Sequence, residues 1–169
     1  VMLCAASWIS LRPMANRRAR LFPRALAAIA IGGGATLLLI TQGVLDLEPW
    51  FSPRYVIPLA GMIFANGMNA ISVAGERLDA ELATGADYVA ARATALRAGL
   101  IPLTNSLFAV GLVAIPGMMT GQILSGVSPL VAARYQIMVM CMVYGSAGIT
   151  TALFLHWNQR DYSTAGSNR

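Results

Sequence analysis

The chain has 169 residues, of which 57% are hydrophobic and only 11% are charged, and its mean hydropathy is +0.63. Soluble domains carry about 25% charged residues, so this composition excludes an ordinary soluble domain and indicates a surface that faces lipid. The formal net charge is +5, and all of the basic residues are arginines. Five of them share one short connector between apolar runs: Arg12, Arg17, Arg18, Arg20 and Arg24. This pattern is typical of a cytoplasmic membrane loop and argues against a nucleic-acid partner.

The first part of the chain predicts a partial helix, a connector and a first full span. The apolar run Val1–Leu11 has half the length needed to cross a bilayer, so we expect the end of a helix whose upstream part is missing. Arg12–Arg24 is expected to be the connector. Ala25–Leu45 is uncharged, and about 20 residues at 1.5 Å per residue cover the ~30 Å hydrocarbon core. The glycine step Gly32-Gly33-Gly34 within it lets a neighbouring helix approach closely.

The middle of the chain predicts a second span and a segment outside the membrane. Asp46–Arg54 is a short acidic connector, and Tyr55–Gly75 is again uncharged and of spanning length. Glu76–Arg97 contains seven charged residues, and this pattern predicts an amphipathic helical hairpin outside the bilayer.

The last part predicts two more helices with an irregular segment between them. A helix is expected over Pro102–Ile115, and Leu130–Trp157 is the last span. Prolines and glycines interrupt Pro116–Pro129, which we interpret as either an outer loop or a re-entrant turn. Residues 158–169 form a polar tail.

Together these elements predict an all-α, polytopic bundle of about four full spanning helices plus part of a fifth, organised as one transmembrane domain over residues 1–157. The positive-inside rule places the Arg12–Arg24 connector, the Glu76–Arg97 hairpin and the C-terminus in the cytoplasm, and we expect the protein in the inner (plasma) membrane. Arg134 does not fit this pattern, because it falls near the outer end of the last span.

Catalysis by this chain is not indicated. Cys4 and Cys141 lie in apolar runs and are expected to be buried, free thiols that pack as small hydrophobes. His156 beside Trp157 is expected to be an interfacial anchor. The sequence contains no nucleophile–base pair, phosphate loop or ligand cluster, so we expect no cofactor and no enzymatic activity, and the metal-binding residues, if any, stay unassigned.

The Glu81-Leu82-Ala83-Thr84-Gly85-Ala86 stretch predicts a stiff elbow between two helices. Gly85 suits the turn, because glycine adopts positive φ without steric cost, and Asp87 can cap the helix that follows. Pro102 suits the first turn of the next helix. The elbow resembles the loop that ABC importer permeases insert into a cleft of their ATPase.

Later blocks in the chain carry a more specific resemblance. They are Gly99-Leu100-Ile101-Pro102-Leu103-Thr104-Asn105-Ser106, Gly111-Leu112-Val113, Pro116 to Gly126 and Ala133-Arg134-Tyr135-Gln136-Ile137-Met138-Val139. In this order and spacing they resemble the UPF0014 family of ABC-type permeases, over about Tyr55 to Trp157. Family members have more spanning helices, which implies that N-terminal helices are absent here. The chain departs from the family in a shorter helix before Gly85 and in Asp87-Tyr88, where a Ser/Thr-Pro start is usual.

The resemblance implies a permease subunit that pairs with a separate ABC ATPase, binds ATP-Mg only through that partner and forms a homodimer in the lipid bilayer. It implies export of metal ions such as iron, with a nucleotide sugar and the opposite direction left open. The residues expected to couple the elbow to the ATPase are Glu81, Gly85, Asp87, Arg92, Arg97 and Pro102. The alternative is a solvated loop with ion pairs along its helices.

Candidate pathway residues lie in two groups. Asn66, Asn69 and Asn105 fall in spanning segments, so they are expected to point into the bundle, where they line a path or only bond between helices. The second group offers a mobile Pro/Gly backbone, soft thioether sulfurs and one charge: Pro116, Gly117, Met118, Met119, Gly121 and Arg134. Arg134 either binds an anionic group or extends to the headgroups.

Two other classes of function remain open. A secondary transporter or channel needs no ATPase, but it usually carries an intramembrane acidic residue, and the uncharged spans have none. A scaffold without transport activity is the third hypothesis.

Overall fold

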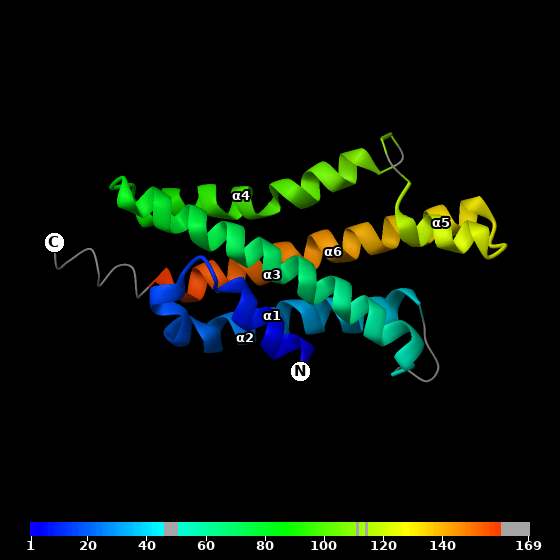
Figure 1. Ribbon diagram of the computed structural model, residues 1–169, viewed down its shortest axis with the longest axis horizontal. Coiled ribbons are helices and arrows are strands. Elements are labelled where there is room, and N and C mark those ends of the chain that lie inside the picture. Colours follow the sequence, from blue (N-terminus) through cyan, green and yellow to red (C-terminus); the bar gives the residue numbers. More distant parts are fainter. Residues whose placement is uncertain (46–50, 111, 114, 160–169) are drawn as a thin grey trace.

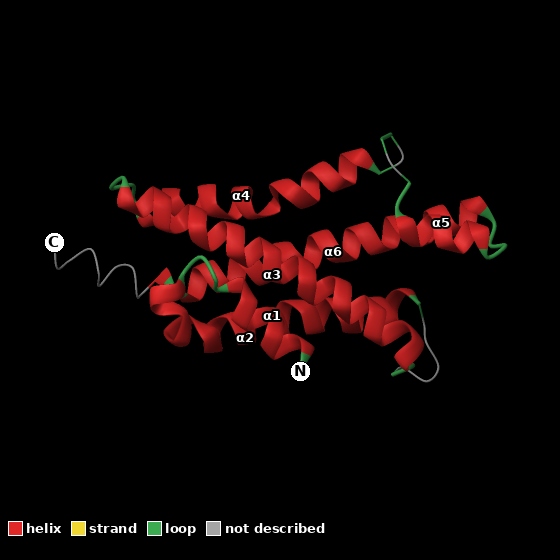
Figure 2. Ribbon diagram, viewed as in Figure 1, coloured by secondary structure: helices red, strands yellow, loops and turns green. Residues whose placement is uncertain are grey.

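The computed structural model describes residues 1–45, 51–110, 112–113 and 115–159, and these residues form helices and no strand (Figure 1, Figure 2). A 3₁₀ turn, η1 (Ala15–Arg17), precedes the second helix, and a π-helical segment, η2 (Leu39–Val44), follows it. The α-helices are α1 (Met2–Ser10), α2 (Arg18–Leu38), α3 (Pro53–Ala83), α4 (Tyr88–Ala109), α5 (Gly117–Leu124) and α6 (Pro129–Trp157). The predicted all-α class is confirmed.

Three of the described helices are long and apolar enough to cross a membrane: Ala15–Val44, which joins η1, α2 and η2, then α3 and α6. α3 packs against α2, α4 and α6, and α6 also packs against α2 and α4, so the long helices form one bundle. The α1–α2 connector, the α3–α4 turn and the end of α6 lie at one end of this bundle (Figure 1). We call this the elbow end. α5 lies at the opposite end.

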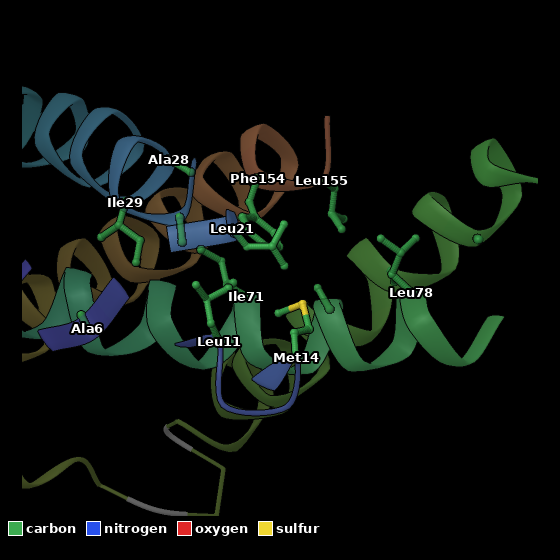
Figure 3. Packing of buried hydrophobic residues seen from close by; sticks show 14 residues of the cluster. Ala6, Leu11, Met14, Leu21, Ala28, Ile29, Ile71, Leu78, Phe154 and Leu155 are labelled. Carbon is green, nitrogen blue, oxygen red and sulfur yellow. The ribbon is translucent and has the colours of Figure 1, made fainter. Parts of the chain in front are cut away.

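The interior consists of two apolar clusters. One lies toward the elbow end, where Leu11, Ile71 and Leu155 are fully buried with no exposed surface (Figure 3). The other includes Ile63, Leu103 and Val139 and joins α3, α4 and α6. Large apolar side chains also cover the outside of the bundle, among them Ile31, Ile57, Ile137 and Ile149. An apolar outer surface over long helices is what a lipid environment requires.

The glycine step in α2 brings two helices into close contact, as predicted. A Cβ atom at Gly32 would lie 2.5 Å from Thr150 Oγ1 and 2.9 Å from the Thr150 backbone nitrogen, so α2 and α6 cross there. A Cβ at Gly33 would lie 2.8 Å from Ile63 Cγ2 of α3. Gly34 faces open space. Two of the three glycines therefore set the distances between helices.

Two predicted boundaries at the elbow end were wrong. The connector does not extend to Arg24, because α2 already begins at Arg18. Likewise, α3 does not end at Gly75 but continues to Ala83. Arginine, glutamate, alanine and leucine are good helix formers, so both helices continue into the polar region instead of stopping where the apolar run stops.

The prediction that Pro102 starts a new helix was also wrong, because α4 runs through it without interruption. A proline inside a helix removes one backbone hydrogen bond and favours a kink. The packing of α4 on α3 and α6 compensates for that loss. The predicted Glu76–Arg97 hairpin is therefore the meeting point of two long helices, not a separate unit.

The segment Pro116–Pro129 was expected to be irregular, but it contains the helix α5. Pro116 is the N-cap of α5, and Gly126, with φ of 89°, makes the turn toward α6. Of the Asp46–Arg54 connector, residues 46–50 lie outside the described residues, as do 160–169 of the predicted tail. Asn158, the first residue of that tail, is 1% exposed and so belongs to the packed bundle.

The expectation that both cysteines are buried was wrong. Cys4 of α1 and Cys141 of α6 are free thiols, but both are exposed on the outside of the described bundle. A helix that faces lipid has an apolar environment on both sides, because the lipid and the protein interior are both apolar. The apolar character of a residue therefore does not reveal whether it is buried in the protein or exposed to lipid.

Candidate functional site

The α3–α4 turn is a Schellman motif with Gly85 at its left-handed position. The Ala86 nitrogen donates to the Glu81 carbonyl oxygen at 3.3 Å, and the Gly85 nitrogen donates to the Leu82 carbonyl oxygen at 3.1 Å. Gly85 has φ of 86°, where a Cβ atom is sterically unfavourable. The predicted glycine turn is present, and it closes the C-terminus of α3 with its backbone groups satisfied.

The start of α4 is held by two hydrogen bonds. Asp87 is the N-cap residue, and its carboxylate accepts from the Val89 nitrogen at 3.1 Å. The Tyr88 hydroxyl donates to the Leu155 carbonyl oxygen of α6 at 2.5 Å. Burial raises the pKa of Tyr88 to about 12, with the nearby Arg92 charge acting in the opposite direction. The hydroxyl is therefore a neutral donor at physiological pH, and it ties the elbow to the last helix.

Ion pairs and amides join the other segments at the elbow end. Arg17 and Asp79 form a salt bridge of 2.6 Å between the connector and α3, and Arg24 Nη1 donates to the side-chain oxygen of Asn158 at 2.8 Å. These contacts place the arginine-rich connector and the end of α6 at the same end of the bundle. Along α3, Arg77 pairs with Glu81 at 2.5 Å, an i,i+4 pair of modest strength.

The predicted coupling residues do not form a single patch. Glu81, Gly85 and Asp87 lie within the elbow turn, and Arg92 is a little more than one turn into α4. Arg97 is exposed further along this helix. Pro102 lies 15 residues after Asp87, which is about 22 Å of helix. The structure therefore brings together the residues of the turn and separates Pro102 from them.

The three asparagines lie on α3 and α4. The Asn66 side-chain amide donates to its own helix, at the Met62 carbonyl oxygen 2.8 Å away, whereas Asn69 and Asn105 are exposed. α3 and α4 cross where a Cβ at Gly99 would lie 2.7 Å from the Ala70 carbonyl oxygen. Because the helices run in opposite directions from this crossing, Asn105 lies toward the same end of α3 as Asn66. They do not point together into the interior of the described bundle.

The remaining pathway candidates are at the opposite end from the elbow. Met118 of α5 packs against the second apolar cluster, and Met119 is partly buried beside it in the sequence. Gly117 and Gly121 of the same helix are exposed, as is Arg134 in the second turn of α6. Within the described ranges, no group of three or more His, Cys, Asp or Glu side chains could hold a metal ion.

Sequence reasoning missed several features. The Tyr88–Leu155 and Arg24–Asn158 contacts join residues 67 and 134 positions apart, and no local pattern reveals such pairs. Gln136 of α6 is 5% exposed, and its side-chain oxygen has no hydrogen-bond partner among the described residues. The position of the Gln136 amide within an apolar span could have predicted that this side chain is buried.

The chain was compared with known proteins. A model of the family described as "Uncharacterised protein family (UPF0014)" matches residues 1–162. The UPF0014 membrane protein slr1647 of Synechocystis is 42% identical over 132 residues, which cover 69% of this chain and 49% of that protein. The probable iron export permease protein FetB of Escherichia coli is 37% identical over 160 residues, covering 85% and 60%. The rice UPF0014 membrane protein STAR2 is 36% identical over 162 residues, covering 85% and 56%.

The matches thus span 49–60% of the length of these three relatives. No solved structure matches the chain.

Proposed function

This chain belongs to the UPF0014 family of membrane proteins, and from that membership we propose that it is the membrane-spanning permease subunit of an ABC transporter. In this proposal ATP-Mg is bound and hydrolysed by a separate ATPase subunit, and two permease copies form the path by alternating access. The elbow end, together with the C-terminal end of α6, lies on the cytoplasmic side of the inner membrane. The arginine content of the α1–α2 connector supports this orientation.

The observation that carries the proposal is the geometry of the elbow. Two long helices meet in a closed turn at Gly85, with Asp87 capping the second helix. Such a turn is well defined, because its backbone groups are paired and Gly85 takes the left-handed position without steric cost. A well-defined projection at the arginine-rich end suits a contact that transmits motion from an ATPase into α3 and α4.

Metal ions, with iron as the leading candidate, are proposed as the exported substrate. The support is the name of the E. coli relative, a probable iron export permease. The soft sulfurs of Met118 and Met119 lie in α5 at the opposite end from the elbow and are compatible with a transition metal in transit. Export of radioactive iron by the full-length protein and its ATPase in proteoliposomes tests this part.

The ATPase contact is tested with two glycine variants of the full-length protein. Gly85 and Gly126 have φ of 86° and 89°, and a Cβ would meet nothing within 4 Å at either. Gly85→Val and Gly126→Val therefore impose the same kind of backbone strain, about 1–2 kcal/mol for a residue with a Cβ, at opposite ends of the bundle.

Each variant is produced together with the candidate ABC ATPase, and the two are purified together in detergent. We expect Gly85→Val to lose the ATPase while Gly126→Val retains it, with equal helix content by circular dichroism. If both variants retain the ATPase, the coupling site is elsewhere. If the folded wild-type protein captures none, the ABC proposal fails, and an ATPase-independent transporter or channel becomes the better hypothesis.

A further inference from the structure

A cleft opens between α4 and α6 beside the elbow. It has a volume of about 310 Å³ and is lined by Arg92, Leu96, Ala152, Leu153, Leu155 and His156. Two basic side chains thus stand at one cavity whose other walls are apolar. Arg92 is partly buried, whereas His156 is exposed at the end of α6.

Beyond the cleft, α6 presents a strip of small residues toward the middle of the bundle, and we call this strip the furrow. Ala152, Gly148 and Gly145 precede His156 in α6 at spacings of three or four residues, so they share one face of the helix. A Cβ at Gly148 would only reach Leu100 of α4, at 4.0 Å, and one at Gly145 would meet nothing within 4 Å. The furrow therefore lacks bulky side chains.

Large apolar side chains are exposed at the same level of the two helices. Ile101 of α4 and Ile149 of α6 are 55% and 50% exposed, and each is adjacent in sequence to Leu100 or Gly148. From Arg92 to Leu100 the distance along α4 is about 12 Å. A molecule that places a charged group at Arg92 and His156 meets Leu96 and Leu153 within the cleft and the small residues of α6 beyond it.

We propose that this cleft binds an anionic phospholipid of the inner leaflet, with the phosphate at Arg92 and His156 and an acyl chain along the furrow. The arginine offers a charge and N–H donors to a phosphate, and the histidine ring offers an N–H donor. Basic pockets between spanning helices on the cytoplasmic side bind such headgroups. Trp157, next to His156, is a residue type enriched at the headgroup level. The furrow favours a lipid over an acidic segment of a protein partner, because such a segment leaves the apolar part unfilled.

The lipid also contacts the elbow in this arrangement. Arg92 lies one turn after Tyr88, whose hydroxyl bonds to the carbonyl oxygen of Leu155 in the cleft wall. A bound lipid therefore reinforces the contact between α4 and α6. The inference depends on the membrane fold and on the proposed cytoplasmic orientation of the elbow end, and not on the proposed ATPase partner.

The test measures lipid retention by the full-length permease alone, in maltoside detergent, by native mass spectrometry. The probes are dioleoyl phosphatidylglycerol, dioleoyl phosphatidylcholine and free glycerol 3-phosphate. We expect preferential retention of phosphatidylglycerol, and a weakening of about fivefold in Arg92→Gln, because one basic contact near a membrane surface is worth about that factor. The matched control is Arg97→Gln, which removes an exposed arginine of the same helix outside the cleft.

A second pair of variants fills space without changing charge. Ala152→Leu occupies the cleft and is expected to reduce phosphatidylglycerol retention, whereas Ala93→Leu, on an exposed face of α4, is expected to leave it unchanged. The proposal is overturned if both phospholipids are retained equally, if Arg92→Gln and Arg97→Gln behave alike, or if free glycerol 3-phosphate displaces the lipid. An Arg92→Gln protein that keeps its lipid but loses the ATPase refutes the lipid site and leaves the proposed function standing.

Discussion

The α2–α6 crossing at Gly32 allows packing in the bundle to be measured with a pair of matched substitutions. Gly32→Ala places a methyl group 2.5 Å from Thr150 Oγ1 and 2.9 Å from the Thr150 backbone nitrogen. A backbone atom cannot rotate away, so α2 and α6 must separate. Gly34→Ala, two residues later in the same helix, meets nothing within 4 Å.

The two variants gain the same intrinsic helix propensity, about 0.8–1 kcal/mol, so their difference isolates the packing cost. Overpacking in a closely packed interior costs about 1–3 kcal/mol. We therefore expect Gly34→Ala to equal or exceed the wild-type stability, and Gly32→Ala to be less stable than Gly34→Ala by that amount. The assay is equilibrium unfolding of the full-length protein in mixed micelles, followed by circular dichroism.

A second substitution checks the cause. Thr150→Ala removes Oγ1 but leaves the backbone nitrogen, so in the Gly32→Ala background it relieves one of the two short contacts. We expect partial recovery of the free energy of unfolding and not full recovery. Equal stability of the Gly32 and Gly34 variants contradicts the close crossing, and full rescue by Thr150→Ala shows that the side chain alone sets the distance.

Three further predictions concern the elbow end. The raised pKa of Tyr88 means that its neutral form is favoured in the folded state. Its contribution to the free energy of unfolding is therefore fully present below pH 10 and is lost as pH rises toward about 12. Tyr88→Phe removes this alkaline dependence, and the late phase attributed to Tyr88 is then missing from a titration followed by tyrosinate absorbance. Asp87→Ala removes the N-cap of α4 and costs about 0.5–2 kcal/mol in detergent unfolding, whereas Asp87→Asn retains most of it. Arg17→Gln weakens a pair with Asp79 whose side chains are 39% and 32% exposed and is expected to cost no more than about 1 kcal/mol in the same unfolding assay; a larger loss contradicts the reading of this contact as a solvent-screened surface pair.

Much of the fold follows from local steric and solvation rules that a sequence exposes directly. The long uncharged runs predicted the spans of α2, α3 and α6 because bilayer thickness fixes their length. Gly85 predicted the elbow turn and Gly32 the close crossing, since both positions depend on the absence of a Cβ atom. These features need no knowledge of distant contacts.

Other features depend on tertiary context and were beyond that reasoning. Pro102 was read as a helix start, but the neighbours α3 and α6 decide whether a helix tolerates a proline. Cys141 was read as buried, and the asparagines as inward-pointing, yet an apolar span does not reveal which of its faces meets lipid. Among the site residues, the turn itself was predictable, while the Tyr88–Leu155 bond that anchors it was not.

The positions of the internal prolines give α3 and α4 different mechanical roles under the proposed mechanism, because Pro58 of α3 lies beyond Asn66 as counted from the elbow, whereas Pro102 of α4 lies before Asn105. Between Glu81 and Asn66, α3 runs 15 residues without proline, about 22 Å of rigid rod. α4 reaches Asn105 only after Pro102, where a lost hydrogen bond allows bending. A displacement of the elbow is therefore transmitted to Asn66 as a rigid-body movement, but it is absorbed in part before it reaches Asn105. Pro102→Ala stiffens α4 between the elbow and Asn105. A loss of transport in this variant indicates that α4 must bend during transport, whereas unchanged transport indicates that it need not bend.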